Sequence, residues 1–459
     1  MGDIIRKIQR ESEWRKVSMS NGRQNIILIM SDDLGYEVIG ANGGSSYKTP
    51  HIDSLAESGM RFDNAHVMPL CTPTRVSLMT GKYNFRNYIG FGLIDPNEIT
   101  VGHLLSDAGY NTCISGKWQL YSYNPLDQSP EDRSKGQMIE DSGFDEFCVW
   151  HAHHTEEKGS RYKNPVIYQN GEFRKDTQGK YGEDIFCDYI IDFIDRKKDD
   201  DSPFFVYWPM AATHKPHEPT PDSPEWDDFD PPSNRSLGAK TWAEVEGDQQ
   251  IDDPRFYKDM VEYHDKVIGR LIQYLSDANL SEDTLIIYLG DNGSPADVCS
   301  MVHEHNEICG GKGKTNDRGT HVPLICSMPG TIPSGSVNTD LIESTDFLPT
   351  IFEALNLDIP NDYAIDGKSF YPQLIGGKGT PRDWIFFHFE PMNARHDMAA
   401  WKAIRFVKDH DWSLYETGEL YDLNADLDED IPIYPSQDSS QQAVARNRLE
   451  PIFAQMVRD

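Results

Sequence analysis

The chain has 459 residues, of which 38% are hydrophobic and 11% aromatic, a composition that supports a buried core and excludes an intrinsically disordered protein. The length predicts one large domain and a smaller one, and no apolar run is long enough to span a membrane. The formal net charge of −32, without any cluster of Lys and Arg, excludes nucleic-acid binding, so a site for an anionic substrate must carry its own positive side chains.

Residues 1–23 are polar and mixed in charge, without the apolar segment and the small-residue cleavage site of a secretory signal. We therefore expect an N-terminal extension, and a cytoplasmic protein for the sequence as written. A signal removed from the chain would instead imply a periplasmic or secreted protein.

Four short apolar runs are typical of buried strands, and each leads into polar residues or glycine. These runs are Asn25–Met30, Asn111–Ser115, Pro203–Trp208 and Thr284–Leu289. Helical patterns lie between them, at Pro50–Leu55, which Gly59 closes, and at Phe256–Leu275. The alternation predicts an α/β fold in residues 24–378, with a large sheet flanked by helices. Ligands bind such sheets at the carboxyl ends of the strands.

The pattern changes after about Gly379. Three predicted strands and a helix follow: Asp383–Phe389, Trp401–Val407, Leu414–Leu423 and Ser439–Val457. We expect a small C-terminal α+β domain at residues 379–459. Two stretches rich in Pro, Asp, Glu and Ser, at residues 125–141 and 220–253, predict surface loops on the substrate side.

Seven cysteines are scattered through the chain, and the absence of a CxxC pair argues against a zinc ribbon or a thioredoxin-like site. Most of them are expected to be buried structural thiols. Cys71 differs, because Cys71-Thr72-Pro73-Thr74-Arg75 opens a predicted helix that Gly81 ends, with Thr72 as N-cap and Pro73 first in the helix. The helix N-terminus and Arg75 favour negative charge at Cys71. The alternatives are a cysteine that merely precedes a helix, or a plain thiolate nucleophile.

Two pairs of polar residues follow predicted strands. Asp32-Asp33 ends the first strand and Asp291-Asn292 ends a later one. Adjacent carboxylates repel one another unless a cation lies between them. Three carboxylates and an amide oxygen suit Ca²⁺ or Mg²⁺ better than zinc. Either pair alone has a simpler interpretation as a turn or a helix cap.

Three basic residues stand near these positions. Lys117 follows the second predicted strand, His214 lies in the loop after the third, and Lys312 lies in a loop with three glycines. Backbone in a glycine-rich loop can approach an anion closely, although the GxxxxGK[ST] pattern of a phosphate-binding loop is not matched. A lone lysine is normally a solvated charge, and a lone histidine is more often structural than catalytic.

Taken in order, these motifs resemble the type I sulfatases of the alkaline phosphatase superfamily, and in particular bacterial polysaccharide sulfatases and arylsulfatases. The resemblance rests on Asp32-Asp33, CTPTR followed by SLMTGKY, GKW at residues 116–118, His214, Asp291-Asn292-Gly293, and the GKGKT loop before Val322-Pro323. It covers roughly residues 24–375. It implies an alkaline-phosphatase-like large mixed sheet with flanking helices.

The resemblance also implies a role for each motif residue. Cys71 matches a cysteine that a formylglycine-generating enzyme oxidises to formylglycine. Asp32, Asp33, Asp291 and Asn292, together with residue 71, match the ligands of a divalent cation, usually Ca²⁺, with Mg²⁺ as the alternative. Arg75 and Lys117 match residues that hold the nucleophile and the sulfate. His214 and Lys312 match residues that bind sulfate and assist the leaving group.

Two departures from the family pattern stand out. Gln119 occupies the position of a histidine found in many members, and Gln does not exchange a proton at neutral pH. His303 and His305 are candidate replacements, against the simpler interpretation of solvated loop histidines. Arg318 stands in Asp317-Arg318-Gly319, where the family usually has Glu-Gly-Gly, and is expected to alter the pocket.

The predicted function is hydrolysis of sulfate monoesters, with a sulfated carbohydrate or an aryl sulfate as substrate. His151, His153, His154 and Arg161 follow Val149-Trp150 and are predicted to contact the sugar or another leaving group, against the alternative of a solvated loop. The rival functions are a phosphonate monoester or phosphodiester hydrolase of the same superfamily, and a non-catalytic sulfoglycan-binding protein. The sequence leaves the sugar and the oligomeric state open.

Overall fold

The computed structural model describes residues 24–127, 133–232, 237–247, 252–390 and 403–457. The predicted N-terminal extension and the first two residues of the predicted strand Trp401–Val407 lie outside the described residues. No described helix is long and apolar enough to cross a membrane.

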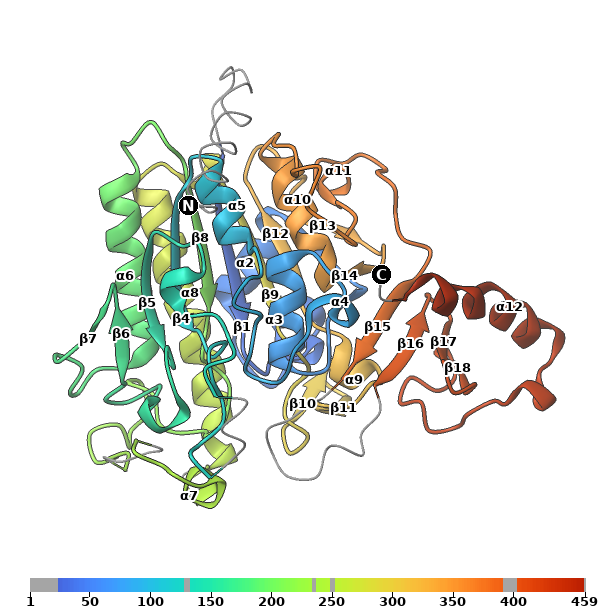
Figure 1. The fold of residues 1–459 in the computed structure, drawn as a ribbon, viewed down its shortest axis with the longest axis horizontal. Helices are drawn as coiled ribbons and strands as arrows, with labels where there is room; N and C mark the ends of the chain where they lie inside the picture. The colour runs from blue at the N-terminus through green and yellow to red at the C-terminus, as the bar shows by residue number, and fades with distance from the viewer. Residues whose placement is uncertain (1–23, 128–132, 233–236, 248–251, 391–402, 458–459) are drawn as a thin grey trace.

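A large mixed sheet forms the centre of the molecule (Figure 1). Its ten strands run in the order β13-β2-β12-β9-β1-β8-β4-β5-β6-β7, and the five from β9 to β5 are parallel to one another. The bounds of these five are β9 Thr284–Gly290, β1 Asn25–Ser31, β8 Phe204–Pro209, β4 Asn111–Lys117 and β5 Glu146–Trp150. The four strands predicted from apolar runs are therefore confirmed and lie next to one another.

The outer strands are short and mostly antiparallel. They are β13 Ser336–Asn338, β2 Met60–Phe62, β12 Leu324–Ser327, β6 Ile167–Gln169 and β7 Glu172–Phe173. β12 runs antiparallel to both β9 and β2, and β6 runs antiparallel to β5. Two small sheets accompany the large one, the hairpin of β10 Cys299–Val302 and β11 Asn306–Cys309, and the pair of β3 Ala65–His66 and β14 Ile342–Glu343.

Helices cover both faces of the large sheet, as the alternating pattern predicted. On one face lie α3 Cys71–Thr80, α5 Val101–Asp107 and α10 Phe347–Ala354, and on the other α2 Pro50–Ser58, α6 Gly182–Lys197 and α8 Tyr257–Asp277. Strand β1 contributes alternate residues to the two cores, Ile26 and Leu28 to the first and Ile27 and Ile29 to the second. A central strand buried on both faces accounts for its unbroken apolar sequence. Short helices complete the fold: α4 Asn84–Asn87, α7 Trp242–Gly247, α9 Asp317–Thr320 and α11 Tyr371–Leu374.

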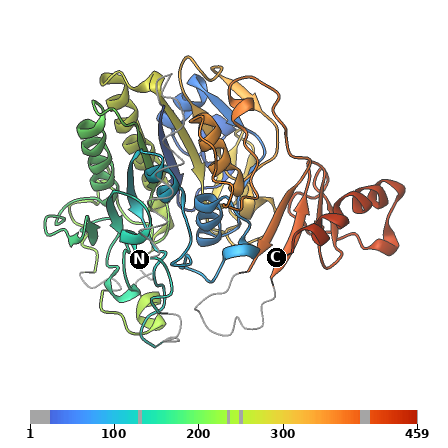
Figure 2. The ribbon, with the colours of Figure 1, turned by 45° about the horizontal axis from the view of Figure 1, so that its top comes forward.

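A separate four-stranded sheet lies to one side of the large one (Figures 1 and 2). It is an antiparallel meander of β15 Ile385–Phe389, β16 Ile404–Lys408, β17 Trp412–Tyr415 and β18 Leu420–Asp422. Helix α12 Ser440–Gln455 packs on one face through Leu449 and Phe453, and Phe387 on the other face packs with Met68 and Leu341 of the larger part.

Two local predictions were wrong. The single strand predicted at Leu414–Leu423 is the end of β17, a turn and then β18, because Gly418 adopts a φ of +106° that permits the reversal. Thr72 is not the N-cap of α3. The helix begins at Cys71 after an extended Leu70, and the Thr72 hydroxyl instead accepts a hydrogen bond from the Gly92 amide at 3.0 Å.

The cysteines divide into two groups. Cys71, Cys113, Cys148, Cys187 and Cys326 are buried free thiols. Cys299 and Cys309 face each other across the β10–β11 hairpin and form a disulfide, which the sequence did not predict. The pairing depends on strand register, which a spacing of ten residues alone does not reveal.

Candidate active site

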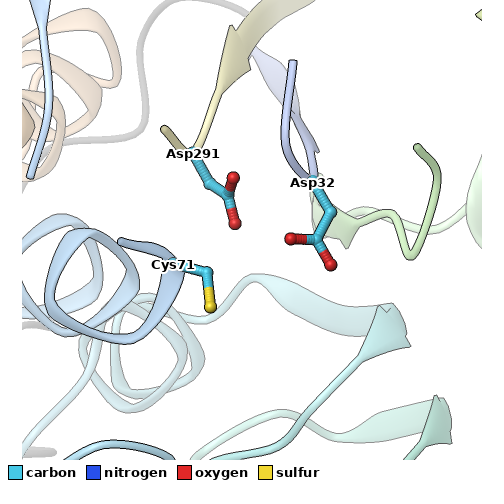
Figure 3. A group of neighbouring side chains, drawn as sticks. All are labelled: Asp32, Cys71 and Asp291. Atoms are coloured by element: carbon cyan, nitrogen blue, oxygen red, sulfur yellow. The ribbon is translucent and has the colours of Figure 1, made fainter. Parts of the chain in front are cut away.

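The carboxyl ends of β1 and β9 bring together the two polar pairs, Asp32-Asp33 and Asp291-Asn292. These strands are neighbours with Ser31 opposite Gly290, so the residues that follow each strand meet at one edge of the sheet. Cys71, the first residue of α3, points toward the same space as Asp32 and Asp291 (Figure 3). One ligand atom from each of these three residues lies within 4.8 Å of the other two, and all three are buried. A second group with the same spacing contains Asp32, Asp33 and His214.

Hydrogen bonds fix the orientation of these polar groups. The backbone amide of Asp33 donates to Oδ1 of Asp291 at 3.0 Å, and Nδ2 of Asn292 donates to Oδ1 of Asp33 at 2.8 Å. Two buried oxygens have no hydrogen-bond partner among the described residues, Oδ1 of Asp32 and Oδ1 of Asn292. Buried acceptors without partners are rare and call for an explanation. Oxygen ligands with negative charge fit a hard divalent cation, so the residues present suit the predicted metal.

The pKa shifts of the carboxylates also indicate a site that needs positive charge. Burial, together with the charges of Asp32 and Asp33, raises the pKa of Asp291 well above its ordinary value. Burial would also raise the pKa of Asp32, but the positive charges of Lys117, Lys312 and Arg161 hold it below its usual range. Three carboxylates this close to one another require positive charge, and the chain supplies part of it from lysines.

Two lysines and a histidine surround the acidic pairs. Nζ of Lys117 lies 2.7 Å from Oδ2 of Asp32, and Nζ of Lys312 lies 2.6 Å from the carboxylate of Asp33. Nε2 of His214 lies 3.8 Å from Oδ2 of Asp33. Lys117 and Lys312 therefore place two positive charges at this edge of the sheet, in a chain whose net charge is strongly negative. An anion that also binds a cation at this edge would be surrounded by donors.

Lys117 depends on a glycine and an arginine for its position. A Cβ on Gly116 would lie 2.0 Å from the carbonyl oxygen of Pro209, so only glycine permits β4 to pass β8 this closely. Arg75, one turn into α3 and 1% exposed, donates through Nη2 to the carbonyl oxygen of Lys117. Arg75 thus connects the helix of Cys71 to the strand of Lys117.

Cys71 itself is enclosed. Burial raises the pKa of its thiol, because desolvation outweighs the favourable charges of Lys117 and Lys312. The environment therefore does not favour an unmodified thiolate as the nucleophile. The Sγ atom lies within 4.8 Å of a carboxylate oxygen of Asp32 and of Asp291, so an oxygen of a modified side chain would stand near the same two groups.

Three residues at the ends of site strands have left-handed backbone conformations, Asp33 at φ +62°, Gln119 at +50° and His151 at +57°. They follow β1, β4 and β5 respectively. Non-glycine residues rarely adopt this region, and such strain concentrates at functional sites. The backbone of Gln119 donates to the carbonyl oxygen of His151 at 3.1 Å, so two of the three positions are coupled.

Five of the predicted substrate residues follow β4 or β5 in the chain. Gln119, His151 and Arg161 are buried, and neither ring nitrogen of His151 has a hydrogen-bond partner among the described residues. His153 packs against Tyr168, and His154 lies 3.1 Å from the hydroxyl of Ser122.

The other three residues lie farther along the chain. His303 and His305 occupy the exposed turn of the β10–β11 hairpin. The guanidinium of Arg318 pairs with Asp428 of the C-terminal part, with Nη2 2.6 Å from Oδ2. The charge of Arg318, which was predicted to alter the sulfate pocket, is thus already paired with a carboxylate.

Sequence reasoning missed the residues that position the His214 loop. Oε1 of Glu183 accepts hydrogen bonds from the amides of Ala211 and Ala212, each at 2.8 Å. The hydroxyl of Tyr162 lies 2.6 Å from the carbonyl oxygens of Ala211 and His214. An acidic residue in the first turn of a helix is ordinarily explained by the helix dipole, so no signal in the sequence marks Glu183 as buried.

Comparisons with known proteins agree with this geometry. A sequence profile of the family described as Sulfatase matches residues 24–357, and one described as N-sulphoglucosamine sulphohydrolase, C-terminal, matches residues 312–455. An N-acetylgalactosamine-6-sulfatase of Canis lupus familiaris is 27% identical over 437 residues, which cover 86% of this chain and 74% of that protein. An N-acetylglucosamine-6-O-sulfatase of Bacteroides thetaiotaomicron is 26% identical over 491 residues, covering 88% and 81%.

A solved structure of a protein in complex with its substrate D-glucosamine-2-N,6-O-disulfate superposes with a TM-score of 0.71 at 22% identity. The match covers 94% of this chain and 97% of that one. At this identity the likeness shows that the two chains share the fold.

Proposed function

The chain belongs to the sulfatase family of sulfuric ester hydrolases, and we propose that it releases sulfate from a sulfated carbohydrate with a formylglycine formed at Cys71 and a bound divalent cation. One observation carries the proposal: ligand atoms of Asp32, Cys71 and Asp291 lie within 4.8 Å of one another at the carboxyl edge of the sheet. The carbohydrate substrate is supported by relatives that are named for N-acetylgalactosamine and N-acetylglucosamine sulfates.

Asp32, Asp33, Asp291 and Asn292 would hold the cation, for which we propose Ca²⁺, with Mg²⁺ as the alternative. When bound, it supplies charge that polarises the sulfate and lowers the pKa of a hydroxyl at residue 71. A formylglycine at this position supplies a hydrated aldehyde, which can take up the sulfate and release it again by returning to the aldehyde. An ordinary serine would leave a stable sulfate ester. Maturation would require a formylglycine-generating enzyme.

The side chains of the chain itself bind and orient the substrate. Lys117 and Lys312 lie against the carboxylates and offer their ammonium groups to the sulfate oxygens, which neutralises the charge that an anionic ester brings to a buried site. Nδ1 of His214 lies 2.6 Å from the carbonyl oxygen of Lys215, which leaves Nε2 turned toward Asp33 and the substrate side. His214 or Lys312 provides the proton for the departing alcohol.

The decisive experiment is expression of the full chain with a formylglycine-generating enzyme, followed by hydrolysis of an aryl sulfate and a matched aryl phosphonate. Sulfate release that requires Cys71, is abolished by EDTA and exceeds phosphonate hydrolysis supports the proposal. Cys71→Ala serves as the control for residue 71. A preference for the phosphonate favours the rival hydrolase. Inactivity toward aryl and glycan sulfates, with formylglycine confirmed by mass spectrometry, favours the sulfoglycan-binding alternative.

We also propose that the protein works in an oxidising compartment, the periplasm or the exterior of the cell. The Cys299–Cys309 disulfide supports this, because structural disulfides persist in such compartments and are rare in the cytosol. Mass spectrometry of the protein purified under thiol-blocking conditions tests it. Blocked thiols at both positions would contradict the proposal.

A further inference from the structure

Arg161 is a buried cation without a counter-ion in the part of the chain that the structure describes. The residue is 8% exposed, and its side chain forms no ion pair or hydrogen bond with any described residue. Nη1 is buried, and no described residue offers it an acceptor. An arginine does not lose its proton in a protein, so burial leaves a full charge to be compensated. An unpaired buried charge is costly, which indicates that an anion completes this position when the protein acts.

The fold holds the guanidinium of Arg161 against Trp150, in the strand next to that of Lys117. Trp150, the last residue of β5, is opposite Lys117 in the parallel register of β5 and β4. The guanidinium carbon of Arg161 lies 4.2 Å from the centre of a Trp150 ring. This stacking fixes the plane of the group but uses the π face, so the N–H donors at its edge stay available.

The neighbouring residue ties the same loop to His214. The hydroxyl of Tyr162 lies 2.6 Å from the carbonyl oxygen of His214, and its ring is buried. Arg161 is thus held between the end of β5, which lies next to Lys117 of β4, and the loop of His214.

We propose that Arg161 is a sulfate-binding residue, whose guanidinium donates to an oxygen of the sulfate on the side of Lys117 and His214. This inference rests on the proposed function and revises the expectation that Arg161 contacts the sugar. It adds to the site a positively charged side chain that lies outside the family motifs. Because the guanidinium is a planar donor, it suits a sulfate edge better than a single sugar hydroxyl.

Two measurements test the assignment, one of which needs no turnover. Inorganic sulfate is titrated into the full chain with Ca²⁺ present, and its affinity is measured by calorimetry and by the rise in unfolding temperature. Kinetics are then measured on 4-nitrophenyl sulfate, which has no sugar. The variants are Arg161→Gln and Arg161→Lys, with Arg174→Gln as the matched control, because Arg174 is a partly exposed arginine paired with Asp176.

Arg161→Gln is expected to weaken sulfate binding and to lower kcat/KM for the aryl sulfate, each about ten- to a hundredfold, the loss expected for a charge-assisted hydrogen bond. Arg161→Lys recovers part of both, and Arg174→Gln leaves both unchanged. Without sulfate, the unfolding temperature of Arg161→Gln is expected to equal or exceed that of the wild type, because the substitution removes a costly buried charge. The stabilisation by sulfate is expected to shrink.

Unchanged sulfate affinity with unchanged aryl sulfate kinetics would overturn the assignment, and a loss confined to glycan substrates would return Arg161 to the sugar. If the matured wild type bound sulfate through Arg161 but hydrolysed no sulfate ester, the proposed function would fail while the assignment stood.

Discussion

Nζ of Lys117 lies 2.7 Å from Oδ2 of Asp32, and each of the two side chains is 2% exposed. The lysine contacts one oxygen of the carboxylate, while the other, Oδ1, is buried and has no hydrogen-bond partner among the described residues. One side chain therefore balances part of the negative charge of the site and leaves a free oxygen directed elsewhere. Oδ1 of Asp32 can therefore bind the proposed cation while Oδ2 holds Lys117 in place for the sulfate.

Lys117→Met should raise the affinity of the protein for Ca²⁺, because it removes a positive charge that competes for Asp32. The same change should lower kcat/KM for an aryl sulfate by about 10²- to 10³-fold, the usual loss when a preorganised donor is removed. Calorimetric titration of Ca²⁺ and steady-state kinetics measure the two effects. Lys180→Met, at an exposed ion pair with Asp176, is the control. Weaker Ca²⁺ binding in Lys117→Met would show that the lysine organises the carboxylates instead.

Removal of the cation should destabilise the folded protein as well as abolish activity. Asp32, Asp33 and Asp291 are buried together, and the charges of Asp32 and Asp33 help to raise the pKa of Asp291. A ligand that binds the folded state alone stabilises it by about 2.7 kcal/mol at a hundred times its Kd. We expect EDTA to lower the unfolding temperature and Ca²⁺ to restore it. Asp291→Asn should show a smaller response, and an equal response in that variant would place the cation elsewhere.

The strands that position the site were predictable because they are buried on both faces and therefore read as unbroken apolar runs, as Asn25–Met30 does. The polar residues after them were predictable for the same reason, since the end of each run marks the edge of the sheet. Glu183 and Tyr162 were not, because their importance arises from contacts with a loop some 30 to 50 residues away in the sequence. Arg161 was predicted to contact the sugar from its place after Val149-Trp150, but its burial without a partner among the described residues could not be predicted from the sequence.

Register and turns account for the errors. The strand predicted at Leu414–Leu423 contains a reversal at Gly418, and apolar residues lie on both sides of it. Thr72 is a residue type that often caps helices, but its hydroxyl accepts a hydrogen bond from the amide of Gly92 in another segment. In both cases a tertiary or turn interaction overrides a local preference.

Glu183 should make stability depend on pH. Burial raises its pKa to about 7, aided by the nearby charges of Asp184 and Asp32, although two backbone amides favour the charged form. The unfolded chain releases this proton near pH 4.5, while the folded protein keeps it to about pH 7, so the folded state is favoured at low pH and loses that advantage as the pH rises through this range. In the wild type, this residue should lower the free energy of unfolding by about 2–3 kcal/mol between pH 4.5 and 7, and we expect Glu183→Gln to abolish that decline. Urea unfolding at several pH values measures it, with exposed Glu172→Gln as the control.

Glu183→Gln should also separate positioning from folding. The Gln side chain retains an oxygen that can accept from the amides of Ala211 and Ala212, so the His214 loop should keep its place and kcat should fall only a few-fold. Glu183→Ala removes the acceptor and leaves two buried amides unpaired. We expect a loss in kcat for aryl sulfate greater than tenfold in that variant. Equal activities for the two variants would mean that the loop is held by Tyr162 alone.

Arg382 should be essential where the four-stranded C-terminal sheet joins the larger part of the molecule. Its Nε lies 2.9–3.0 Å from both oxygens of Asp346, its Nη2 lies 2.9 Å from Glu343, and its side chain is 4% exposed. Arg382→Met leaves two buried carboxylates without their cation, which costs about 3–5 kcal/mol of unfolding free energy. The double variant Arg382→Met with Asp346→Asn should be less destabilised than the sum of the single changes, because the two residues act through one contact. Denaturant unfolding of the four proteins measures the coupling. Strict additivity would show that Arg382 stabilises the junction by packing rather than by charge.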